Sequence, residues 1–162
     1  MDQQLIQPFI EATLSVLNTM GQIECYPGKI VEKVGTKTYG CLTGAISMTD
    51  PKVTGTLTVS FDENTILQVV SNMFMEQIKE ISPDVIDAVG EITNMICGAA
   101  KTTLSTMGYS FDMSTPFVIT GKDIELKQLS KATTYSIPFT SEAGWFVIEL
   151  CFVVPGTKPS IS

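Results

Sequence analysis

The chain has 162 residues, a length typical of one domain that can bury about 70% of its unfolded surface without disulfides or a structural metal. Its formal net charge is −7 and it has no run of Lys or Arg. This excludes binding that draws its energy from contacts with nucleic-acid phosphates. We expect a single domain over residues 1–155, a flexible tail over 156–162, and no nucleic-acid partner.

Composition indicates a globular protein that does not enter membranes. The hydrophobic share is 44% and the charged share 17%, and this apolar balance makes an oligomer plausible. No charged-then-apolar signal segment opens the chain. The longest apolar run, residues 145–154, is interrupted by Glu149 and has about half the length that a spanning helix requires. We therefore expect a soluble, cytoplasmic protein with no membrane insertion.

The cysteines carry no sign of metal or redox chemistry. They are far apart in the sequence, form no C-x-x-C motif, and are accompanied by no histidine: Cys25, Cys41, Cys97 and Cys151. Most zinc-site patterns and every Ser-His or Cys-His nucleophile pair are thereby excluded. We interpret all four as reduced packing residues.

The first half of the chain predicts a helix, a group of strands and a second helix. Residues 5–20 place apolar side chains at helical period. Residues 26–60 are rich in Val, Thr, Ile and Tyr and are broken by Pro-Gly and Asp-Pro turns, which predicts about three strands in an antiparallel meander. Residues 62–78 predict the second helix, with Asp62 as its N-cap.

The next segment predicts one long helix over residues 83–107. Ser82 is the expected N-cap, and Pro83 suits the first helical position, where no amide donor is needed. Gly108 is expected at C′, just past the end. Such a helix would be about 37 Å long, at 1.5 Å per residue.

Three more strands follow, over residues 115–120, 131–140 and 144–154. The last is apolar on both alternating faces, with Glu149 as the exception, so we expect a central strand or one at a subunit interface. Together the elements predict an α+β, two-layer fold. An antiparallel-rich sheet of about six strands packs with three helices, one of them long.

The long helix divides into an apolar and a polar side. At about 100° per residue, Asp87, Asn94 and Gly98 lie close to Glu91 around the axis. The opposite arc is apolar and consists of Val85, Val89, Ile92, Ile96, Ala100 and Leu104. We call Asp87, Glu91 and Asn94 the polar ridge. Thr93, on the apolar side, and Met95, beside the ridge, depart from this division.

Several interpretations of the polar ridge are open from periodicity alone. It is either an ordinary solvated helix face or a functional surface. A general acid and base pair of Asp87 and Glu91 is disfavoured because nothing near the helix start raises a carboxylate pKa toward neutrality. A metal site is equally disfavoured because the ridge lacks further ligands. Gly98 serves either tight packing or close access to Asn94.

The order D-x-x-x-E-x-x-N, with Asp87, Glu91 and Asn94, is followed by Gly-Ala-Ala and by Pro116. This arrangement resembles the signature of the CheC/CheX/FliY family of chemotaxis phosphatases, and its CheX-like members most of all. The layout is also similar, from the opening helix containing PFIEAT to the final strand containing IELCF. The resemblance covers essentially the whole chain and implies a CheC-like fold.

The resemblance implies a hydrolase that removes the phosphoryl group from the active-site aspartate of a phosphorylated CheY-type response regulator. In that scheme Asn94 orients the attacking water and Glu91 pairs with the regulator's lysine. Asp87 has a supporting or docking role, and Gly98 lets the regulator approach the helix. No cofactor of the chain's own is implied, and Mg²⁺ is expected on the regulator.

The family also implies a homodimer in which the sheets join across subunits. Relatives of the CheC type carry two sites, but the corresponding positions of the first helix here are Gln7, Glu11 and Leu14. Leucine cannot orient water, so we expect one active helix per chain. The alternatives are a non-enzymatic module of the same fold that binds a response regulator or a flagellar switch component, and an unrelated acidic scaffold.

Overall fold

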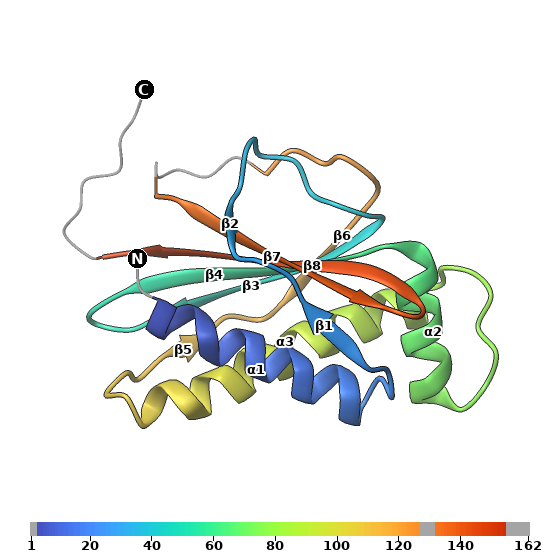
Figure 1. Cartoon of the computed structure of the whole chain (residues 1–162), viewed down its shortest axis with the longest axis horizontal. Helices are drawn as coiled ribbons and strands as arrows, with labels where there is room; N and C mark the ends of the chain where they lie inside the picture. Colours follow the sequence, from blue (N-terminus) through green and yellow to red (C-terminus); the bar gives the residue numbers. More distant parts are fainter. Residues whose placement is uncertain (1–2, 127–131, 155–162) are drawn as a thin grey trace.

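The computed structural model describes residues 3–126 and 132–154. Helices cover one face of an antiparallel sheet (Figure 1). The helices are α1 (Gln3–Thr19), α2 (Glu63–Phe74) and α3 (Pro83–Ser105). The strands are β1 (Cys25–Pro27), β2 (Val31–Glu32), β3 (Leu42–Thr49), β4 (Thr54–Phe61), β5 (Asp112–Met113), β6 (Phe117–Thr120), β7 (Thr134–Ser141) and β8 (Gly144–Val153).

The sheet confirms the predicted α+β fold class. Its strand order is β1-β7-β8-β4-β3-β5, with β2 paired to β7 and β6 paired to β3, and every pairing is antiparallel. It has eight strands instead of about six. The additional strands include β2 and β5, which have two residues each. Segments this short carry no alternation that a sequence pattern could reveal.

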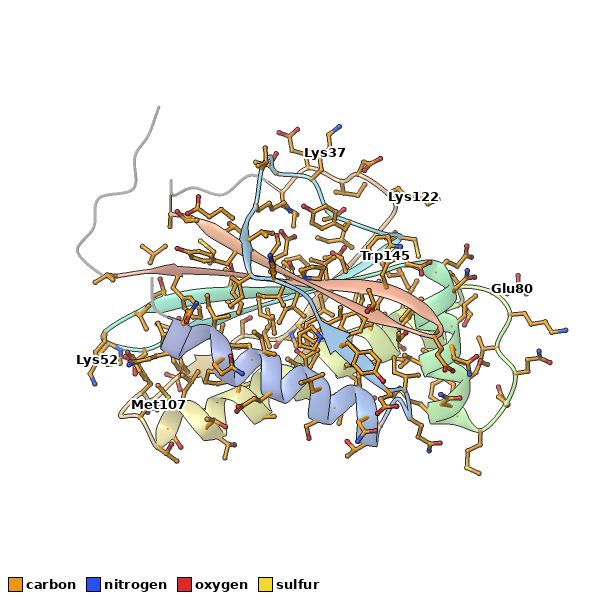
Figure 2. All side chains as sticks on the ribbon, in the orientation of Figure 1. Lys37, Lys52, Glu80, Met107, Lys122 and Trp145 are labelled. Carbon is orange, nitrogen blue, oxygen red and sulfur yellow. The ribbon has the colours of Figure 1, made fainter. Side chains whose placement is uncertain are left out.

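The two long helices α1 and α3 pack beside each other on the same face of the sheet. Segments around β2 and after β6 lie on the other face (Figure 1), where Lys37 and Lys122 project from the loops (Figure 2). The described residues share one hydrophobic core, while the domain boundaries at 1–155 stay a prediction. The predicted tail, 156–162, lies outside the described residues. No helix within 3–126 and 132–154 is long and apolar enough to cross a membrane.

Strand β8 is central and covered on both faces, which confirms the prediction from its doubly apolar pattern. On the helix side, Phe146 stacks on Phe139 with ring centroids 4.8 Å apart. On the other side, Glu149 is 4% exposed and pairs with Lys33 at 2.8 Å. The Ser136 hydroxyl donates a second bond to Glu149 at 2.9 Å. The one carboxylate in this strand is therefore buried with its partners in place.

Helix α2 begins as predicted but ends early. Asp62 is its N-cap, and its side chain accepts the Asn64 N–H. The predicted end at residue 78 is wrong because Met75 adopts the left-handed conformation, with φ of 55°, and its N–H bonds the Ser71 carbonyl. The Ser71 hydroxyl then accepts the Ile78 N–H at 2.9 Å, which holds the chain in its new direction.

Helix α3 begins at the predicted residue, with the Ser82 hydroxyl accepting the Val85 N–H. It ends at Ser105, with Thr106 as the C-cap, two residues before the predicted end. Gly108 is left-handed at φ of 92°, but it follows the cap by two residues instead of standing at C′. A further turn of the chain, in which the Gly108 N–H bonds the Ser105 carbonyl, accounts for the difference.

The turn between β3 and β4 holds the end of α3. The Asp50 carboxylate accepts the backbone N–H groups of Ser110, at 2.6 Å, and Lys52, at 2.7 Å. The Ser110 N–H holds the pKa of Asp50 below its usual value. Lys52 Nζ donates to the Gly108 carbonyl at 2.9 Å. Figure 2 shows Lys52 and Met107 together at this end of the molecule.

All four cysteines are free thiols, which confirms their interpretation as reduced packing residues. Burial raises the pKa values of Cys25 and Cys97 to about 11. These thiols therefore stay protonated near neutrality and make poor nucleophiles.

Helix α3 packs very closely on the sheet at Gly44 of β3. A Cβ atom at this position would overlap the Thr93 hydroxyl and lie 3.3 Å from a methyl group of Val89. The Thr93 hydroxyl is satisfied within its own helix because it donates to the Val89 carbonyl at 2.8 Å. This explains why the polar residue Thr93 lies on the apolar side of α3. Its side chain is small enough to fit over Gly44, and its hydroxyl already has a hydrogen-bond partner in its own helix.

Gly44→Ala should lower the free energy of unfolding by about 1–3 kcal/mol, because the added methyl group forces α3 away from β3. Urea denaturation followed by circular dichroism measures the change. The double variant Gly44→Ala with Thr93→Ala removes the overlapping hydroxyl and should recover part of the loss. Unchanged stability of the single variant would contradict this packing.

Candidate functional site

Helix α3 separates its buried and exposed sides sharply. Its buried residues are Val85, Ala88, Val89, Ile92, Thr93, Ile96, Cys97, Ala100 and Leu104. The three residues of the polar ridge, Asp87, Glu91 and Asn94, are all exposed. The ridge therefore faces solvent, as the helical period predicts, and a buried ridge is excluded.

The polar ridge is unpartnered within the part of the chain that the structure describes. The side chains of Asp87, Glu91 and Asn94 make no hydrogen bond and no ion pair with other described residues. The ridge thus offers two free carboxylates and one free amide at spacings of four and three residues. The amide can donate and accept hydrogen bonds at the same time, and the carboxylates can pair with cations.

A groove of about 670 Å³ runs along one side of the ridge. Its second wall is the segment 113–118, which contains the end of β5 and the start of β6. We call this space the ridge groove. Its lining residues are Ile86, Asp87, Gly90, Glu91, Asn94, Met113, Ser114, Thr115, Pro116, Phe117 and Val118. Pro116, which the motif spacing singled out, is one of the lining residues of the second wall.

The rest of the second wall was missed by sequence reasoning. The segment reaches the ridge because β6 pairs with β3, the same strand that α3 covers at Gly44. Ser114 fixes its approach, since its N–H donates to the Ser47 carbonyl at 2.9 Å and its hydroxyl accepts the Ser47 N–H at 3.0 Å. Pro116 in the motif was the only signal in the sequence for this contact.

Gly98 lies on the same helix side as the ridge, one turn beyond Asn94. A Cβ atom built there comes within 4 Å of no atom beyond its chain neighbours and the backbone of its own helix. The interpretation of Gly98 as a tight-packing residue is therefore wrong, and the helix surface at this point is open. Gly98 does not line the ridge groove.

The first helix does not reproduce the ridge. Gln7 and Glu11 are exposed, but Leu14 is half-buried against the hydrophobic core. No amide stands at the third position, so the prediction of one active helix per chain agrees with the side chains present. Among residues 3–126 and 132–154, no group of three His, Cys, Asp or Glu side chains is arranged to hold a metal ion.

Gly98→Ala should raise the free energy of unfolding by about 0.5–1 kcal/mol, because alanine favours the helix and its methyl group meets open space. Thermal or urea unfolding tests this directly. Gly44→Ala is the matched control, since the same chemical change there should have the opposite sign. A loss of stability on Gly98→Ala would restore the packing interpretation.

Comparisons with known proteins agree with this geometry. The family described as chemotaxis phosphatase CheX matches residues 42–140. A CheC-like superfamily protein from Shewanella sp. PV-4 is 39% identical, with a TM-score of 0.88 over 94% of this chain and 99% of that one. The CheY-P phosphatase CheX of Thermotoga maritima is 28% identical over 146 residues, which are 88% of this chain and 92% of the relative.

The fold is also that of CheX in the CheX-CheY-BeF3-Mg²⁺ complex from Borrelia burgdorferi. That protein is 24% identical, with a TM-score of 0.76 over 91% of this chain and 96% of that one. The family match includes Asp87, Glu91, Asn94 and Pro116 within its span. The resemblance based on these residues is confirmed, and the chain belongs to the CheX family of chemotaxis phosphatases.

Proposed function

We propose that the chain removes the phosphoryl group from the active-site aspartate of a phosphorylated CheY-type response regulator, with the polar ridge as its active surface. The observation that carries the proposal is the exposed, unpartnered amide of Asn94 one turn after the free carboxylate of Glu91. The activity of the Thermotoga relative, a CheY-P phosphatase, supports the choice of substrate. The complex of the Borrelia protein with CheY supports the choice of partner.

The phosphatase has to supply only one element of this reaction, because the regulator supplies the others. A water oxygen attacks phosphorus, the bond from phosphorus to the aspartate oxygen breaks, the aspartate leaves as a carboxylate, and inorganic phosphate is released. The charge on the phosphoryl group is neutralised by a divalent cation and a lysine on the regulator. Mg²⁺ accompanies CheY in the Borrelia complex, so the metal belongs to the partner in this scheme. The missing element is a water held in line with phosphorus.

Asn94 supplies that element. Its amide cannot take a proton near neutrality, but its oxygen can accept a hydrogen bond from the water, and its nitrogen can donate one. The helix backbone at Asn94 is held in place because two nearby residues of α3, Thr93 and Ile96, are fully buried against the core. Docking therefore does not have to order the backbone that carries the amide, and only the rotation of the Asn94 side chain remains to be restricted.

Glu91 and Asp87 serve docking in this proposal. Glu91 pairs with the regulator's lysine, and a contact that excludes water would give both affinity and register. Asp87, one turn earlier and on the same side, adds a second negative charge for the partner's basic groups. Gly98, with open space around it, lets the regulator's loops approach the helix backbone. A homodimer joined through the sheets stays a prediction.

Asn94→Ala should reduce catalysed turnover by roughly a hundredfold or more while leaving binding nearly unchanged, because the water is no longer oriented. The test follows the decay of radiolabelled phosphoryl group on a purified CheY-type regulator with Mg²⁺, alone and with substoichiometric amounts of the chain or the variant. Decay that the native chain does not accelerate would favour the non-enzymatic binding module. Full activity of the variant would remove Asn94 from the mechanism.

Glu91→Gln should weaken binding to the regulator by roughly tenfold or more, because it removes the charge while keeping the shape of the side chain. Titration calorimetry with the BeF3-treated regulator measures the affinity. Glu11→Gln, on the exposed side of α1, is the matched control and should bind like the native chain. Equal affinities for both variants would contradict the docking role of Glu91.

A further inference from the structure

The ridge groove has an apolar part and an acidic part. Half-buried apolar side chains line one part of it: Ile86, Met113, Pro116 and Val118. The carboxylates of Asp87 and Glu91 line the other. No Lys or Arg is among its described lining residues. An occupant would therefore meet an apolar surface and an uncompensated negative edge within one space.

Gly90 keeps this groove open. A Cβ atom at Gly90 would lie 3.4 Å from a methyl group of Val118, an ordinary contact distance. Packing therefore does not require glycine here, in contrast to Gly44, where a methyl group would overlap Thr93. A glycine inside a helix is less favourable than alanine. A longer side chain at this position would occupy the groove beside Glu91.

The second wall is held in place before any partner arrives. Residues 117–120 pair with β3, and Ser114 exchanges two hydrogen bonds with the backbone of Ser47. An occupant would not have to order this wall on binding, so the contact would not lose affinity to the cost of fixing a loop.

We propose that the ridge groove receives a second segment of the response regulator, one that carries a cationic side chain next to an apolar one. This inference rests on the proposed function, because it assigns the groove to the same partner that the polar ridge engages. The apolar side chain packs against Met113, Pro116 and Val118, and the cation pairs with Asp87. The contact adjoins the water-orienting amide without involving the phosphoryl group.

Charge and continuity favour this occupant over a second copy of the chain. The chain carries a formal net charge of −7, so a copy would bring further negative charge toward Asp87 and Glu91. The groove is also continuous with the ridge, since Asp87, Glu91 and Asn94 belong to both. A partner seated on the ridge would necessarily cover the groove's opening.

Filling the groove tests the inference. Gly90→Leu should weaken binding of a purified CheY-type regulator by roughly tenfold or more, in both its unphosphorylated and its BeF3-treated forms. The maximal rate at saturating phosphorylated regulator should change far less than the concentration needed for half-saturation. Ala99→Leu adds the same side chain at an exposed position of α3 outside the groove, and it should bind like the native chain.

A second variant guards against a folding defect in the first. Thr115→Arg places a cation of the chain's own at an exposed position on the second wall, where it can compete for Asp87. It should weaken binding in the same way. Circular dichroism and thermal unfolding check that both variants fold.

The outcomes separate this inference from the proposed function. A native chain that accelerates dephosphorylation while Gly90→Leu and Thr115→Arg bind normally would overturn the groove contact alone. A native chain that binds through the groove without accelerating decay would overturn the phosphatase activity alone. Binding by neither regulator form overturns both. A native dimer that either variant converts to a monomer in sedimentation would assign the groove to a second copy and overturn the inference.

Discussion

The contact between α3 and β3 at Gly44 is the constraint on which the orientation of the polar ridge depends. Because no side chain intervenes there, Thr93 can sit directly on the sheet, and the rotation of α3 about its own axis is fixed. Residues 91 and 94, on either side of Thr93 along the helix, are thereby turned outward. If α3 rotated about its axis by the angle between successive residues, about 100°, the polar ridge would no longer face solvent beside the ridge groove.

The two sides of α3 differ in their contacts: the buried side is packed firmly, and the polar ridge is free within the described part of the chain. The buried side of α3 is continuous with the core, while the ridge has no partner among the described residues. In the proposed function such a surface needs no metal of its own, because the acyl phosphate is already activated and the regulator would supply the cation. Folding provides position: an amide carried on a firmly packed helix, beside a carboxylate and an open groove.

The sequence predicts the parts of this site that lie on one helix and misses the parts that come from distant segments. Ser82, Pro83 and the helical period identify α3 and its exposed side, because capping and amphipathicity are local effects. The wall from Met113 to Val118 depends on strand pairing with β3, which no local pattern encodes, and only Pro116 signalled it. The end of α2 was missed for a related reason: Met75 is left-handed without being glycine or asparagine. Whether Gly98 serves packing or access was open until its surroundings were known.

The measurement that tests the central claim most directly is the fate of the oxygen and phosphorus atoms in the catalysed reaction. Radiolabelled phosphorylated regulator is hydrolysed in water enriched in heavy oxygen, with enough of the chain for nearly all turnover to be catalysed. If Asn94 orients a water toward phosphorus, one heavy oxygen enters the released phosphate, none enters the regulator's aspartate, and no radiolabel is found on the chain. Heavy oxygen in the aspartate, or radiolabel on the chain, would contradict the account, because the reaction would then proceed through attack at carbon or through a phosphorylated intermediate.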